Sequence, residues 1–310
     1  MHTPPHIPRR SFIRAAALAT LAPAVHAASA GKDGEWIDAH VHVWTPDTGR
    51  YPLASGFKVA DMKPASFTPA ELFAHCKPEG VSRVVLIQMS YYQSDNRYML
   101  DMMAGHRGTF SGVAIVDEKK ADVRDTMKSL AMQGVRGFRL YTDKEKAEAW
   151  NSSEGMKKMW TYGADAGLSM CLLANPDALP AVHRMCKAFP KTRVVIDHFA
   201  RIGVKGSVEQ VDLDNLCRLA EFDHVYVKAS AFYALGEKRA PYTDLGPMIR
   251  KLRDVYGASR LMWASDCPFQ VQGAHTYADS IALIRDRLDF LTADERRWML
   301  RRTAEKVFFA

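Results

Sequence analysis

Eight short apolar segments alternate with longer amphipathic segments from residue 36 onward. The apolar segments are nearly continuous runs of Val, Ile, Leu and similar residues, which is typical of parallel strands buried on both faces. We expect strands at 36–42, 83–89, 112–116, 135–141, 169–174, 193–198, 224–229 and 260–265. Eight parallel strands separated by helices predict an α/β fold, a single (β/α)8 barrel of the TIM type.

Helix signals lie between the predicted strands. Capping-box patterns open helices at Thr68 and Thr292, and a glycine or proline ends the predicted helices 122–133 and 177–189. No linker or repeat interrupts this alternation, so we expect one domain over residues 31–310. An open doubly wound sheet is the alternative fold, but no glycine-rich phosphate-binding loop follows any predicted strand.

The first 30 residues have the pattern of an export signal. Arg9 and Arg10 precede an apolar stretch at 15–22, and small-residue cleavage sites follow at Ala27 and Ala30. The paired arginines resemble a twin-arginine (Tat) signal. A membrane-spanning helix needs ~20 apolar residues, and this stretch is far shorter. We therefore expect export to the periplasm by the Tat machinery, with residues 1–30 as the signal peptide and no stable membrane insertion.

Composition and charge exclude several classes of protein. Of the 310 residues, 47% are hydrophobic and 25% are charged, as in an ordinary globular protein. The formal net charge of +7 includes three arginines and no acid in the first 30 residues, which leaves +4 on the body. That charge is too small and too evenly spread to indicate nucleic-acid binding. Five cysteines without a Cys-x-x-Cys pair argue against a disulfide framework and against a Cys-ligated zinc site.

Three of the predicted strands end in side chains that can bind metal or transfer protons. His40 and His42 lie two residues apart on the first strand, so both side chains point to the same side. His198 ends the sixth strand and Asp266 ends the eighth. The two histidines alone are equally compatible with packed polar residues. A barrel, however, brings the ends of all three strands together, and the four side chains could then hold one divalent metal ion, zinc being the first candidate.

Further side chains near the predicted strand ends are candidate substrate contacts. Burying the charge of Arg139 at the barrel mouth without an anionic partner would cost free energy. We therefore assign Arg139 to a substrate carboxylate rather than to a core salt bridge. Tyr141 and Arg201 are further candidates. Tyr91 could hydrogen-bond the substrate or stack in the core, and Lys228 could bind the substrate or pair with an internal acid. These residues predict a small anionic or polyhydroxylated substrate.

Four short segments together resemble the amidohydrolase superfamily, and within it the amidohydrolase-2 group of lactonases and decarboxylases. They are Ile37-Asp38-Ala39-His40-Val41-His42, Asp197-His198, Tyr226-Val227-Lys228-Ala229-Ser230 and Trp263-Ala264-Ser265-Asp266-Cys267-Pro268. The resemblance covers about residues 36–309 and is nearest to the branch of sugar lactonases and 2-pyrone-4,6-dicarboxylate lactonase. Strands four and five lack the bridging Lys or Glu and the His of two-metal members. The resemblance therefore implies either one divalent ion or metal-free hydrolysis.

We accordingly expect a hydrolase that opens a lactone, a cyclic ester. Asp266 would activate water and then return the proton, while His198, His40 and His42 would polarise the carbonyl directly or through a metal ion. Nonoxidative decarboxylation of an unsaturated or aromatic acid is the alternative, because decarboxylases of this group share the same four residues. A non-catalytic periplasmic binding protein is disfavoured, because binding alone gives no reason to gather three histidines and an aspartate.

Overall fold

A computed structural model describes Met1 and residues 35–310. The predicted signal peptide and its cleavage sites, Met1 apart, lie outside the described residues. Eight strands form one sheet in chain order, and each strand is parallel to the next. They are β1 (Trp36–Val41), β2 (Val81–Ile87), β3 (Phe110–Ala114), β4 (Val135–Thr142), β5 (Ser169–Ala174), β6 (Arg193–Ile196), β7 (Val225–Ala229) and β8 (Leu261–Trp263).

The sheet closes on itself through the segment that follows β8. The amide of His42 donates to the carbonyl of Cys267 (2.8 Å), and the amide of Asp266 donates to the carbonyl of His40 (2.9 Å). Val41 and Cys267 also form a parallel bridge. The predicted (β/α)8 barrel is therefore confirmed, and its seam joins the two chain segments that carry three of the four candidate site residues.

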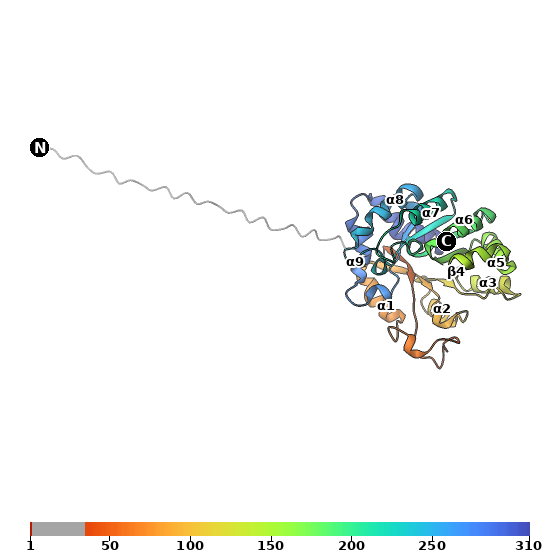
Figure 1. Ribbon diagram of the computed structural model, residues 1–310. Coiled ribbons are helices and arrows are strands. Elements are labelled where there is room, and N and C mark those ends of the chain that lie inside the picture. The colour runs from red at the N-terminus through yellow and green to blue at the C-terminus, as the bar shows by residue number, and fades with distance from the viewer. Residues whose placement is uncertain (2–34) are drawn as a thin grey trace. The chain divides into compact units, whose positions relative to one another are not determined.

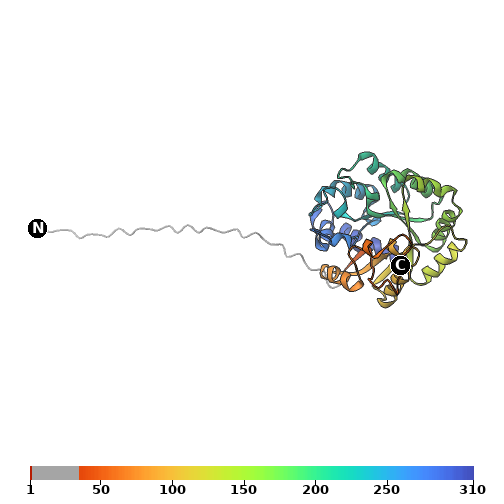
Figure 2. The same ribbon diagram turned by 60° about the horizontal axis from the view of Figure 1, so that its bottom comes forward.

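Helices surround the strands in both views (Figures 1 and 2). The predicted capping boxes at Thr68 and Thr292 are present, each with the threonine side chain accepting from the amide three residues later. Within the described residues no helix is long and apolar enough to cross a membrane. The helices are α1 (Pro69–Cys76), α2 (Arg97–Gly105), α3 (Val123–Met132), α4 (Lys144–Ala149), α5 (Glu154–Ala166), α6 (Leu179–Ala188), α7 (Gln210–Arg218), α8 (Gly246–Tyr256), α9 (Tyr277–Ala282), α10 (Ala293–Arg297) and α11 (Thr303–Phe308).

Two apolar clusters account for the continuous hydrophobic runs of the strands. The larger cluster packs the outer faces of the strands against the helices. The smaller cluster draws residues such as Val85, Val113 and Val195 from seven of the eight strands and is the barrel interior. Val307 and Phe308 of α11 belong to the same interior cluster. Seven strands are thus buried on both faces, as their residue patterns predict, whereas β4 contributes no residue to the interior cluster.

Five strands, β1, β2, β3, β6 and β8, end one or two residues earlier than the sequence predicts, and two of these differences concern site residues. β6 ends at Ile196 and β8 ends at Trp263, so His198 and Asp266 lie in the turns that follow rather than in the strands. Both residues have positive φ angles, 53° and 64°. Such a backbone conformation cannot continue a pleated strand, which is why the strand boundaries in the sequence-based prediction were wrong here.

Candidate active site

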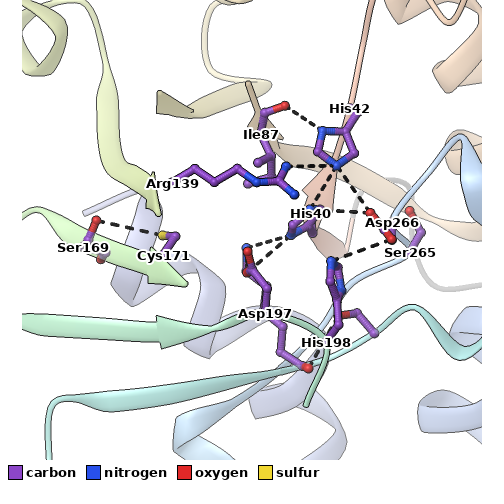
Figure 3. A network of polar contacts seen from close by, with 12 residues as sticks. His40, His42, Ile87, Arg139, Ser169, Cys171, Asp197, His198, Ser265 and Asp266 are labelled. Atoms are coloured by element: carbon purple, nitrogen blue, oxygen red, sulfur yellow. Dashed lines mark hydrogen bonds and ion pairs between the residues drawn. The ribbon is translucent and has the colours of Figure 1, made fainter. Parts of the chain in front are cut away.

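A local irregularity in β1 turns two histidines toward the barrel mouth. Ile37 and Ala39 belong to the interior cluster, whereas Val41 packs in the outer one, so the alternation of faces changes phase between them. The pairing of β1 with β2 shifts register at the same place. An extra residue of this kind re-aims the side chains that follow it. As a result the Nε2 atoms of His40 and His42 lie 3.2 Å apart (Figure 3).

A left-handed turn after β6 presents His198. The four consecutive residues 198–201 have φ angles of 53°, 51°, 54° and 61°, and none of them is glycine. This conformation costs an L-residue roughly 1–2 kcal/mol, so the surrounding packing must hold it. The middle residues Phe199 and Ala200 are fully buried. Residues one helical turn apart share a side, and His198 and Arg201 accordingly line the same cavity.

The carboxylate of Asp266 lies among the three histidines. Its Oδ1 is 3.5 Å from the Nε2 atoms of both His40 and His42, and its Oδ2 is 3.7 Å from Nε2 of His198. The hydroxyl of Tyr233 donates to Oδ2 at 2.7 Å. The structure therefore brings together all four residues that the sequence singled out and adds Tyr233. No sequence pattern marks this tyrosine, which lies in a single 3-10 turn (Phe232–Ala234) after β7.

The protonation of the cluster follows from burial and hydrogen bonding. Burial lowers the pKa of His40, His42 and His198, so these rings are neutral at neutral pH. Burial by itself would raise the pKa of Asp266, but the close contacts of its carboxylate with the three histidines outweigh it and hold that pKa below its usual range. Nδ1 of His42 donates to the carbonyl of Ile87 at 2.9 Å, which leaves the Nε2 lone pair facing the cavity.

The donor set fits one divalent metal ion. His40, His198 and Asp266 each offer a ligand atom, and these atoms all lie within 4.8 Å of one another. Oδ1 of Asp266 is buried and has no hydrogen-bond partner among the described residues. Two imidazole nitrogens and a carboxylate oxygen are ligands that zinc accepts. His42 is adjacent to this set through its contact with Oδ1 of Asp266.

Lys228 lies behind His40 and not in the cavity. It is fully buried, and its Nζ is 3.0 Å from Oδ1 of Asp197 and 3.2 Å from Nδ1 of His40. Burial would raise the pKa of Asp197, but the Lys228 charge outweighs it and holds the pKa well below its usual range. Of the two alternatives for Lys228, the structure shows the internal ion pair. Asp197, to which the sequence analysis assigned no role, is its partner.

A cavity of about 260 Å³ lies over the cluster. Arg139, Tyr141 and Arg201 line it, as do His42, His198 and Asp266. Nη1 of Arg139 is 3.4 Å from Nε2 of His42, and Nη1 of Arg201 donates to the side-chain oxygen of Asn175 at 3.0 Å. Among the described residues, no carboxylate forms an ion pair with either arginine. Two cationic groups therefore face this cavity without an acidic partner.

Tyr91 is placed apart from the cavity lining. Its hydroxyl donates to the carbonyl of Asp61 at 2.9 Å, and its ring packs edge-on against Trp44 at 5.3 Å between ring centroids. Tyr91 itself is almost completely buried. Of the two alternatives for Tyr91, these contacts support stacking in the core and not hydrogen bonding to the substrate.

Comparison with known proteins identifies the family. Residues 37–310 match the amidohydrolase family model. The chain is 28% identical to an L-fucono-1,5-lactonase of Burkholderia ambifaria over 77% of this chain and 82% of the relative. It is 27% identical to a 4-sulfomuconolactone hydrolase of Rhizobium radiobacter over 76% of each chain.

A solved structure has the same fold. It is an amidohydrolase from Burkholderia multivorans crystallised with bound zinc, with a TM-score of 0.73 and 19% identity. The match covers 88% of this chain and 99% of that one. The barrel fold agrees with the family match, which covers nearly all of the described residues. The chain belongs to the amidohydrolase family and is a hydrolase.

Proposed function

We propose that the protein hydrolyses the ester bond of a lactone that carries an anionic or polyhydroxylated group. The observation that carries the proposal is one ionised carboxylate, Asp266, held among three neutral histidines beneath a cavity that two unpaired arginines also face. A lactone needs an activated water, a polarised carbonyl and a proton for the departing oxygen, and this set supplies all three. The named activities of the two relatives, both on lactones, support the same substrate class.

Asp266 is the general base of the proposed reaction. As an ionised carboxylate it accepts a proton from a water molecule, and the resulting nucleophile attacks the lactone carbonyl. Asp266 then returns the proton to the ring oxygen as the C–O bond breaks, which yields a hydroxy acid. The hydroxyl of Tyr233 holds the carboxylate in place through Oδ2. Arg139 and Arg201 bind the anionic or hydroxylated substituent.

The histidines polarise the carbonyl by one of two arrangements. A divalent ion held by His40, His198 and Asp266 would supply Lewis-acid chemistry when bound. Without it, Lys228 can donate to Nδ1 of His40, and the Ser230 hydroxyl, 2.8 Å from Nδ1 of His198, can donate to that ring. Both rings then carry their proton on Nε2 and can donate it to the developing oxyanion. Elemental analysis of protein purified without chelators distinguishes the two arrangements.

The variant Asp266→Asn tests the proposal because it keeps the shape but cannot accept a proton. General acid–base catalysis contributes typically 10²–10⁴-fold, so kcat for acid release from a lactone should fall by about that factor, with KM little changed. Asp289→Asn, an exposed aspartate of the helical shell, serves as the matched control and should retain full activity. Carbon dioxide should be measured in parallel with acid release. Near-parental turnover by Asp266→Asn would refute the assignment of the base, and carbon dioxide release without lactone opening would refute the reaction.

A further inference from the structure

A second and larger cavity adjoins the one above the catalytic cluster. It has a volume of about 890 Å³, against about 260 Å³ for the first. Ser90, Arg139 and Tyr141 line both cavities, so the two meet along these residues. The walls of the larger cavity come from β4, α4, the start of α5 and the segments that follow β1, β2 and β3. This cavity therefore occupies the half of the barrel mouth built by the first four strands.

The sizes of the two cavities indicate a substrate longer than one lactone ring. Small-molecule sites usually measure ≈ 300–1,000 Å³, and the catalytic cavity alone lies below that range. The lining of the larger cavity includes none of the three histidines and not Asp266. Its volume is thus available for binding, apart from the residues proposed for the chemical step. A substrate that reaches from one cavity to the other would use both.

The walls of the larger cavity combine an apolar floor with a polar rim. Val116, Leu140, Trp150 and Met156 line it and are themselves at most 8% exposed. The polar part of the lining includes hydroxyl, amide and ammonium groups from Ser90, Gln93, Ser94, Ser153, Lys119 and Lys146. The carboxylates of Asp117 and Glu118 and the side chains of Arg139 and Tyr141 also belong to it. A sugar ring has matching chemistry, because its C–H groups form an apolar face and its hydroxyl groups lie around the edge. A long alkyl chain would leave the polar rim without partners.

We propose that the larger cavity is a subsite for a glycosyl unit attached to the lactone, so that the substrate is a lactone derived from an oligosaccharide. This proposal rests on the proposed lactone hydrolysis. The lactone ring would lie over Asp266, and the second sugar ring would lie against Trp150. Arg139, at the junction of the two cavities, would contact the polar groups between the rings.

Binding of the hydrolysis products tests the subsite without turnover. Calorimetry would compare gluconate, which has one sugar unit, with cellobionate, which has an additional glucosyl unit. We expect cellobionate to bind the wild-type protein at least tenfold more tightly, which corresponds to about 1.4 kcal/mol. Ala149→Trp and Ser94→Trp fill the cavity from two different walls, at positions that are exposed to solvent. Each should abolish the preference for cellobionate and leave gluconate binding unchanged.

The matched control is Ala104→Trp, at an exposed position on α2 that lines neither cavity. It should retain the tenfold preference. Equal affinity of the wild-type protein for the two acids would overturn the subsite, as would a preference that survives in both cavity-filling variants.

Hydrolysis of the corresponding 1,5-lactones separates this inference from the proposed function. In the wild-type protein kcat/KM should be at least tenfold higher for the cellobiose-derived lactone than for glucono-1,5-lactone, and Ala149→Trp should remove the difference. Opening of both lactones at equal kcat/KM would overturn the subsite while the lactonase proposal stands. Failure to open either lactone, or any other lactone of a panel, would overturn the proposed function and the subsite with it.

Discussion

Two buried aspartates near the barrel seam have pKa values that are shifted in opposite directions. Asp38 accepts hydrogen bonds from the amides of Ser265 and His40 and from the hydroxyl of Tyr277. Burial nevertheless raises its pKa to about 6, because these hydrogen bonds offset only part of the desolvation. Asp266 has its pKa lowered and faces the cavity. Asp38 therefore ties β1 to the segment after β8, whereas Asp266 is the base of the proposed reaction.

Arg139 should contribute most binding energy when the substrate carries an anion. A hydrogen bond to a charged group is worth about 1.5–3 kcal/mol, so Arg139→Ala should raise KM about ten- to a hundredfold for a carboxylated lactone. A neutral lactone with the same ring should show a much smaller change. Steady-state kinetics on the two substrates provide the measurement. An equal increase in KM for both substrates would indicate that Arg139 has a structural role and does not bind a substrate carboxylate.

The candidate site could be predicted from the sequence where a side chain ends a strand. His40, His42, His198 and Asp266 each follow an apolar run, and the barrel topology alone places such residues together. An internal ion pair of Lys228 was one of two alternatives, but its partner Asp197 and the role of Tyr233 could not be predicted. These contacts join different strand ends and loops, so they depend on the packed structure and leave no local pattern.

At the scale of elements, the left-handed turn after β6 is the most unusual feature. The fold and its strand order could be predicted from the apolar runs, but this turn could not. Glycine is the usual residue at positive φ, and residues 198–201 contain none. The sequence-based expectation therefore extended β6 through His198. The turn is held by tertiary packing of Phe199 and Ala200, which are fully buried.

Ala200→Gly tests whether this turn stores backbone strain. Relief of the positive-φ conformation is worth roughly 1–2 kcal/mol. The lost buried methyl costs about 0.8 kcal/mol and the added chain flexibility about 0.5–1 kcal/mol. The free energy of unfolding should therefore change by about zero. Ala131→Gly in the right-handed helix α3 is the matched control and should lose about 1 kcal/mol. Urea unfolding of both variants provides the comparison, and an equal loss in the two would exclude strain at Ala200.

For the whole molecule, the barrel gathers many buried ionisable groups at one end of the strands. Three neutral histidines, Asp266 and the pair of Lys228 with Asp197 are all at most 5% exposed. Buried groups whose pKa differs from that of the unfolded chain make stability depend on pH. The site should therefore dominate the acid sensitivity of the fold.

Mild acid should destabilise the protein because its site histidines resist protonation. The pKa values of His40, His42 and His198 are lowered from 6.5, so below about pH 6.5 the unfolded chain binds up to three protons that the folded protein does not. Asp38 acts in the opposite direction: its pKa is raised from 3.8 to about 6, so near pH 5 the folded protein binds one proton that the unfolded chain does not.

Three histidines act against one aspartate, so unfolding should take up protons as the pH falls from 8 toward 5. The free energy of unfolding should therefore fall over this range, by about 1.36 kcal/mol per pH unit for each proton that is taken up on unfolding. Urea unfolding at pH 8, 6.5 and 5 measures the slope, with a chelator present so that no metal ion competes for the histidines. Asp38→Asn provides an internal check, because it removes the opposing titration and should steepen the loss of stability. Stability that stays constant or rises from pH 6.5 to 5 would mean that the site histidines are charged in the folded protein. The proposed neutral cluster around Asp266 would then be wrong.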